Sequence, residues 1–90
     1  MTYRVVLRPA AVRALQRMPM KISAACWEFI HGPLAENPHR VGKPLFGPLA
    51  GCHGARRGTY RIVYRIDENT RTVHVLDIDH RADIYHRPQT

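Results

Sequence analysis

Arginine dominates the side chains of this 90-residue chain that can do chemistry. Lysine and arginine number fourteen against seven acidic residues, the formal charge is +7, and the only lysines are Lys21 and Lys43. The planar guanidinium group of arginine presents paired donors that match the oxygens of a phosphate. Arg56, Arg57 and Arg61 cluster near glycine and tyrosine. This pattern favours a polyanionic partner, either nucleic acid or an acidic protein segment, over a basic surface that serves solubility alone.

The six histidines and two cysteines form no metal or redox motif. The histidines stand at positions 31, 39, 53, 74, 80 and 86, without the paired spacing of zinc ligands and without a cysteine cluster. Cys26 lies in an apolar helical stretch, where a free cysteine behaves as a small buried hydrophobe, and Cys52 follows a glycine. We therefore expect no metal and no cofactor, and the spacing gives little reason to expect a disulfide.

Length and composition favour one small globular domain that spans residues 1–90. Hydrophobic residues make up 44% of the chain, which is ordinary for a folded domain and argues against disorder. No stretch approaches the roughly 18 apolar residues of a membrane span. The N-terminus lacks an apolar run with a cleavage site, so we expect no secretory signal, no membrane association and a cytoplasmic location.

The first half of the chain predicts one strand and two helices. Residues 3–7 are aromatic and β-branched, as in a strand. Pro9 suits the first turn of a helix, and a helix is predicted over 10–18. Apolar residues at helical spacing predict a second helix over 21–31, which Gly32-Pro33 breaks or kinks before a last turn over 34–37.

The second half predicts a connecting loop and three strands. Glycines and prolines punctuate residues 38–51, so this stretch is expected to be a loop whose Leu45, Phe46 and Leu49 pack into the core. Strands with short turns are then expected over 53–57, 60–66 and 72–78. The tail over 80–86 is expected to form a short turn or helix.

The element order β-αα-βββ predicts an α+β fold with two layers. An N-terminal strand and a two-helix hairpin precede an antiparallel three-strand meander, and the first strand joins the edge or the centre of that sheet. Alternation along the second meander strand places Tyr60, Ile62 and Tyr64 under the helices. Arg61 and Arg65 then lie on the opposite, open face.

Four runs of residues resemble the signature of the RelE/ParE superfamily of toxins. They are NPHRVGKPL at 37–45, GPLAG at 47–51, RRGTYRIVYRID at 56–67 and HRADIY at 80–85. The resemblance covers essentially the whole chain and implies the two-layer RelE-like fold. It implies the toxin of a type II toxin–antitoxin system, a ribosome-dependent endoribonuclease that cleaves mRNA in the A site without a metal and so inhibits translation. It also implies a RelB-like antitoxin as partner.

The resemblance assigns catalytic roles to four residues. Arg61 matches the strand arginine that stabilises the transition state, and Arg81 matches a position that binds the scissile phosphate. His80 is a candidate general acid or base, because its ordinary pKa lies near neutrality. Tyr85 matches a C-terminal tyrosine that stacks on a base or assists proton transfer. The alternatives are solvated arginines, a basic turn with surface ion pairs, and an aromatic anchor for the tail.

Arg56, Arg57, His53 and Lys43 are the residues expected to bind RNA. Strand alternation lets only one of Arg56 and Arg57 share a face with Arg61. Many RelE-type ribonucleases carry lysine on the strand before the Gly-x-Tyr-Arg turn, but the stretch here is CHGA at 52–55. This departure leaves His53 as a candidate base and puts the proton-transfer groups in question.

Two other functions are compatible with the same motifs. A ParE-like toxin inhibits DNA gyrase by binding it, without nuclease activity, and a degraded relative retains only the binding of its antitoxin. Fold alone does not distinguish these three functions. The toxicity of Arg61→Ala and Arg81→Ala variants tests the nuclease function, because a folded variant that stays toxic counts against a nuclease mechanism.

Overall fold

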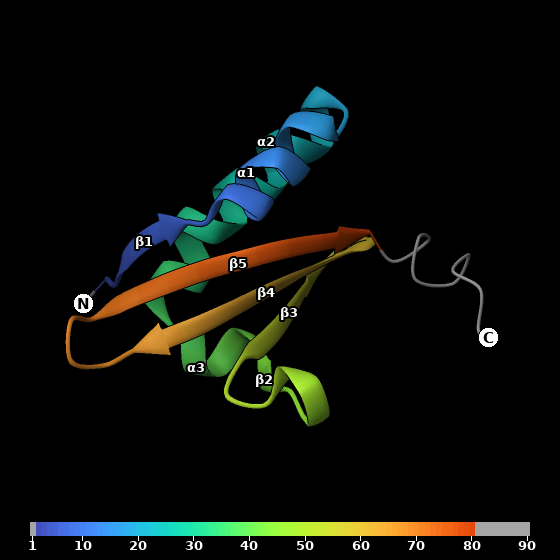
Figure 1. The fold of residues 1–90 in the computed structure, drawn as a ribbon. Helices are drawn as coiled ribbons and strands as arrows, with labels where there is room; N and C mark the ends of the chain where they lie inside the picture. Colours follow the sequence, from blue (N-terminus) through green and yellow to red (C-terminus); the bar gives the residue numbers. More distant parts are fainter. Residues whose placement is uncertain (1, 81–90) are drawn as a thin grey trace.

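The computed structural model describes residues 2–80 and contains one five-stranded sheet with helices packed on it (Figure 1). The strands are β1 (Arg4–Leu7), β2 (Lys43–Pro44), β3 (His53–Arg57), β4 (Tyr60–Asp67) and β5 (Thr72–His80). The helices are α1 (Pro9–Arg17), α2 (Met20–Phe29) and α3 (Pro38–Val41). The spatial strand order is β1-β5-β4-β3-β2, and only the β1–β5 pair is parallel. The predicted α+β class and antiparallel meander are therefore confirmed, with β1 at an edge.

The two-helix hairpin begins and ends at prolines. Pro9 occupies the first turn of α1, where its missing N–H is not needed, and Pro19 separates α1 from α2. The buried Ala11 and Ala14 face the sheet, and small side chains there allow α1 to pack closely against β5. Figure 1 shows α1 and α2 lying together along the β1 side of the sheet.

Of the predicted break or kink at Gly32-Pro33, the break does not occur, and the predicted last turn follows as helical residues 35 and 36. The helix instead continues from α2 into a π-helical turn, Ile30–Leu34, which contains Pro33. Proline removes one backbone donor and clashes with the preceding α-helical turn, and a wider π turn accommodates both effects without ending the helix. As a result Ile30 and Leu34 are both fully buried in the core.

The stretch expected to be a loop over 38–51 has more structure than predicted. It contains α3, strand β2 and a 3₁₀ turn, Gly47–Leu49. Leu45 is half-buried, but Phe46 is 84% exposed and Leu49 is 39% exposed, so the prediction that they pack into the core is wrong. Glycines with positive φ at 47 and 51 turn this segment outward, beyond the edge of the sheet.

The core lies between the helices and one face of β4 and β5. As predicted, Ile62 and Tyr64 are fully buried and Tyr60 packs at the margin of the cluster. Cys26 is also buried and, like Cys52, is a free thiol. The buried apolar set that holds the helices on the sheet comprises Tyr3, Ala11, Ala14, Ile30, Leu34, Ala55, Ile62, Tyr64, Val73, Val75 and Ile78.

A β-bulge interrupts the pairing of β4 with β5. Tyr64 pairs with Val75, but Val63 pairs with Asp77, so Leu76 is an extra residue on β5. The buried positions of β5 are accordingly Val73 and Val75 before the bulge and Ile78 after it. One irregular step thus keeps apolar side chains on the core face along the whole strand.

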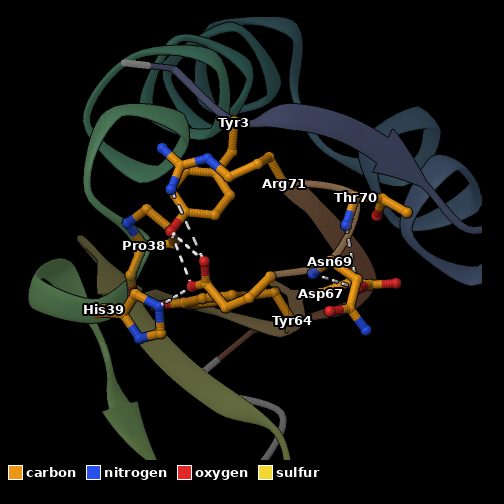
Figure 2. A network of polar contacts seen from close by, with 9 residues as sticks. Tyr3, Pro38, His39, Tyr64, Asp67, Asn69, Thr70 and Arg71 are labelled. Carbon is orange, nitrogen blue, oxygen red and sulfur yellow. Dashed lines mark hydrogen bonds and ion pairs between the residues drawn. The ribbon is translucent and has the colours of Figure 1, made fainter.

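A polar cluster fastens the N-terminus to the β4–β5 turn and to α3 (Figure 2). The Tyr3 hydroxyl donates to Glu68 at 2.8 Å, and His39 also contacts the Glu68 carboxylate. The Arg71 guanidinium lies 4.2 Å from the centre of the Tyr3 ring. The hydrogen bonds from His39 and then Tyr3 lower the pKa of Glu68, whereas the bond to Glu68 raises the pKa of Tyr3. This cluster holds together segments that are far apart in the sequence.

Candidate functional site

One face of the sheet carries a row of charged residues across three strands. Arg56 of β3 pairs with Arg61 of β4, and Arg61 pairs with Asp79 of β5. Because side chains directly opposite one another in a sheet share a face, these three residues lie side by side. We call this side, which is opposite to the buried Ile62 and Tyr64, the Arg61 face.

The Arg61 guanidinium is held partly buried next to Asp79. Its Nη2 atom lies 3.4 Å from Asp79 Oδ2, and the two side chains are 34% and 21% exposed. Its Nε atom is buried and finds no hydrogen-bond partner among residues 2–80. Because the side chain is partly exposed and makes one long contact, the guanidinium retains the capacity to bind another anion.

Gly54 makes room for the Arg61 side chain. A β-carbon at Gly54 would lie 3.4 Å from Arg61 Cδ and 3.1 Å from Leu45 Cδ2. The absence of a side chain therefore lets the aliphatic part of Arg61 and the Leu45 side chain lie across the strand. This glycine belongs to the CHGA stretch in which a lysine is lacking.

Lys43 extends the basic surface to the edge of the sheet. Its strand, β2, pairs with β3 so that Lys43 lies opposite Gly54. Lys43 and Arg56 line a hollow of about 420 Å³, together with Val41, Gly42 and Gly54. The structure thus brings Arg56, Arg61 and Lys43, three of the residues predicted from sequence, to one face.

His53 lies on the opposite face, against the core. Its ring stacks on Tyr64 with centroids 5.5 Å apart and meets His39 edge-on at 5.9 Å. Burial, and secondarily the charge of His39, lower the pKa of His53, and its Nδ1 atom has no hydrogen-bond partner within residues 2–80. His53 is therefore a neutral packing residue at pH 7 and is not next to Arg61.

Arg57 also lies away from the Arg61 face. It lines a different hollow of about 500 Å³, formed with α2 and the π-helical turn by Ala25, Glu28, Phe29 and Pro33. Of the two consecutive arginines, Arg56 is the one that shares the face of Arg61, and the residues predicted to bind RNA are consequently divided between two faces.

The other predicted catalytic residues lie at or beyond residue 80, the last residue that the structure describes. His80 is the last residue of β5, and its backbone pairs with Tyr60, not with Arg61. Arg81 and Tyr85 lie outside the described residues, as does the predicted C-terminal turn or helix. The proximity of these groups to Arg61 stays a prediction.

Asp79 is the site residue that sequence reasoning did not select. The strand pairing starts at the turn, where Asp67 lies opposite Thr72. Arg61 is six residues before Asp67, so regular pairing would place it opposite Ile78, which is six residues after Thr72. The bulge adds one residue, so Asp79 lies opposite Arg61 instead. The signal in the sequence is the apolar series Val73, Val75 and Ile78, which departs from strict alternation by one residue.

The described part of the chain has neither a cluster of metal ligands nor a membrane-spanning helix. Among residues 2–80 no three His, Cys, Asp or Glu side chains gather as metal ligands. In the same range no helix is both long and apolar enough to cross a membrane.

The family model described as ParE toxin of the type II toxin–antitoxin system parDE matches residues 5–85. The chain therefore belongs to the ParE toxin family and is a toxin of a type II toxin–antitoxin system.

The similar proteins are RelE-type toxins. The chain is 52% identical to Toxin RelE of Mycobacterium tuberculosis over 83 residues, which are 92% of this chain and 86% of that protein. It is 53% identical to Toxin RelG of the same organism over 87 residues, 97% of this chain and 100% of that protein. These relatives make it a member of the RelE/ParE superfamily with RelE-like sequence.

Solved structures have the same fold. The crystal structure of the RelBE2 toxin–antitoxin complex of M. tuberculosis contains a chain with a TM-score of 0.86 and 49% identity, covering 90% of this chain and 100% of that one. The isolated RelE toxin of E. coli gives a TM-score of 0.72 at 17% identity, covering 92% of this chain and 90% of that one. The predicted RelE-like fold is confirmed.

Proposed function

We propose that this toxin is an endoribonuclease that cleaves mRNA in the A site of translating ribosomes and thereby stops translation in the cytoplasm. The observation that carries the proposal is the pair of arginines, Arg56 and Arg61, directly opposite each other on one sheet face. Two adjacent guanidinium groups bind the oxygens of a phosphodiester. The RelE and RelG names of relatives that are about half identical to this chain support the same activity.

The reaction we propose uses the 2′-hydroxyl of the RNA as its nucleophile. Attack on the neighbouring phosphorus generates a phosphorane with additional negative charge on its oxygens. Arg61 stabilises that charge, since a positioned cation interacts more strongly with the transition state than with the starting phosphodiester. Arg56 and Lys43 bind flanking phosphates. Arg81 and His80 are proposed to bind the scissile phosphate and transfer a proton, and Tyr85 to stack on a base.

An antitoxin is the proposed protein partner. The chain resembles the toxin of a RelBE2 complex over nine-tenths of its length, and a RelE–RelB complex of Pyrococcus horikoshii has a related toxin at 25% identity and a TM-score of 0.64. We propose a RelB-like protein that inhibits the toxin. Acidic segments in that protein would complement the +7 charge of this chain.

Toeprinting of a translated mRNA with the purified toxin tests the nuclease activity. We expect new mRNA ends only when ribosomes are present, and we expect Arg61→Ala to reduce the cleavage rate by about 10²-fold or more. Arg13→Ala is the matched control, because Arg13 is an exposed arginine on α1. Intact mRNA under conditions in which ribosomes translate it would contradict the proposal.

Inhibition of DNA gyrase is the second candidate function. The family model that matches residues 5–85 is described as the ParE toxin of parDE systems, and this match is the observation that favours gyrase inhibition. A gyrase supercoiling assay separates the two candidates. Accumulation of relaxed plasmid together with intact mRNA would favour gyrase inhibition.

A further inference from the structure

The Arg61 face contains one carboxylate in contact with the central arginine. Asp79 pairs with Arg61 in the sheet register, and its Oδ2 atom is 3.4 Å from Arg61 Nη2. Adjacent strands are about 4.8 Å apart, so the row from Arg56 through Arg61 to Asp79 spans about 10 Å. A phosphate bound by the two arginines would therefore lie close to this carboxylate.

The contact between Asp79 and Arg61 leaves both groups available for a substrate. Charge-assisted hydrogen bonds between guanidinium and carboxylate groups are usually about 2.7–2.9 Å long and often paired. Here a single, longer contact joins the two groups. The second carboxylate oxygen of Asp79 is not used in this contact, and the Arg61 side chain is 34% exposed.

Other described groups are less suited to accept a proton beside Arg61. His53 is on the core face against Tyr64, so it does not meet a phosphate bound by Arg61. Asp77 lies opposite Val63, two residues from Asp79 on the same face of β5. Its Oδ1 atom accepts a hydrogen bond from the Ile78 N–H. Lys43 is a cation at the edge of the sheet. Among the described side chains, which end at Asp79, this aspartate is thus the acceptor that touches the proposed phosphate-binding arginine.

We propose that Asp79 is the general base of RNA cleavage, an inference that rests on the proposed nuclease function. The Asp79 carboxylate takes the proton of the 2′-hydroxyl while the 2′-oxygen forms its bond to phosphorus. The bond from phosphorus to the 5′-oxygen breaks, and the departing 5′-oxygen takes a proton from the general acid, the role that the proposed function leaves to His80. The products are a 2′,3′-cyclic phosphate and a 5′-hydroxyl end. Arg61 both stabilises the phosphorane and orients the carboxylate through their contact.

The groups facing Asp79 are consistent with this role. Arg61 of β4 is the charged group in contact with it, and Arg56 of β3 is one strand further away. Asp77 is the nearest carboxylate along β5 on the same face. Asp79 therefore has two cations on one side and one anion on the other.

Single-turnover cleavage of an mRNA on programmed ribosomes, at saturating toxin, tests the proposal. Asp79→Asn keeps an oxygen that can accept a hydrogen bond from Arg61 but cannot take the proton, so we expect the rate to fall about 10²–10⁴-fold with little change in ribosome affinity. Asp77→Asn is the matched control and should cleave at the wild-type rate, because an asparagine oxygen can still accept the Ile78 N–H.

Chemical rescue separates proton transfer from a purely structural role. In Asp79→Ala, added imidazole should restore part of the rate in proportion to the concentration of its neutral form, whereas a lost structural contact would not respond to a diffusible base. A thermal melt confirms that the variant is folded.

Three results have separate meanings. If wild-type toxin cleaves and Asp79→Asn stays within about threefold of it, the general-base assignment is overturned while the nuclease function stands. A folded Asp79→Ala variant that imidazole fails to rescue also overturns the assignment. If the wild-type toxin itself does not cleave ribosome-bound mRNA, the proposed function fails, and this failure is seen before any variant is compared.

Discussion

Replacement of Gly42 by alanine is a stringent test of how the segment that carries Lys43 is fixed to the sheet. Gly42 follows α3 with φ −126° and ψ −179°, an extended conformation that any residue adopts. The substitution therefore adds no backbone strain, and its effect comes from the new methyl group alone. That methyl would overlap the Tyr64 hydroxyl and lie only 2.9 Å from the carbonyl oxygen of Gly54.

Neither neighbour of this methyl group can move easily. Tyr64 is fully buried, and its hydroxyl donates to the Pro38 carbonyl at 2.5 Å. The Gly54 carbonyl belongs to β3, inside the sheet. Relief of the overlap requires α3 and β2 to move away from β4. Overpacking of this kind costs about 1–3 kcal/mol, and loss of the Tyr64–Pro38 hydrogen bond adds about 1 kcal/mol. We expect Gly42→Ala to lose about 2–4 kcal/mol of unfolding free energy.

Urea unfolding followed by circular dichroism measures this loss. With a slope of about 1 kcal/mol per molar urea for a domain of this size, the midpoint should fall by about 2 M or more. Gly32→Ala is the matched control. Among residues 2–80, no atom outside the local helix backbone lies within 4 Å of the site for its β-carbon. Because Gly32 is in a helical turn, we expect its unfolding free energy either to stay unchanged or to rise by about 1 kcal/mol. Equal stability of the two variants would refute the packing argument.

Three further substitutions test other parts of the structure. Burial raises the pKa of Tyr64 to about 12 from 10.0. The neutral phenol contributes its full stability below pH 10, and the unfolding free energy should fall by about 3 kcal/mol as the pH rises toward 12. Tyr64→Phe should abolish that alkaline loss, and an unchanged pH–stability curve would contradict it. Burial lowers the pKa of His53 from 6.5. Below pH 6.5 the unfolded chain therefore binds a proton more readily than the folded chain, so the unfolding free energy falls with pH. His53→Gln should make stability depend less on pH between 7 and 5, and thermal melts at each pH measure this. Phe46→Ser should change the unfolding free energy by less than about 0.5 kcal/mol, because the ring is exposed; a larger loss in urea would mean that the ring is packed in solution.

Local patterns in the sequence determined most of the framework. Alternation in YRIVYRI predicted that Ile62 and Tyr64 are buried while Arg61 faces the other way, because side chains along a strand point to opposite faces in turn. The turn residues fixed the order and spacing of β3, β4 and β5, and Pro9 marked the start of α1. These features depend only on neighbours in the chain, so a single sequence was sufficient to predict them. Such patterns did not determine how Pro33 would be accommodated or that Phe46 would be exposed.

The neighbours of Arg61 were decided by tertiary structure. The bulge at Leu76 shifts the partner of Arg61 from Ile78 to Asp79, and a bulge is selected because it keeps Val73, Val75 and Ile78 in a core shared by two strands. In the same way, the pairing of β3 with β4 places His53 opposite Tyr64, on the core face and away from Arg61. Both outcomes depend on the register between strands, since only the folded core makes one register more stable than another.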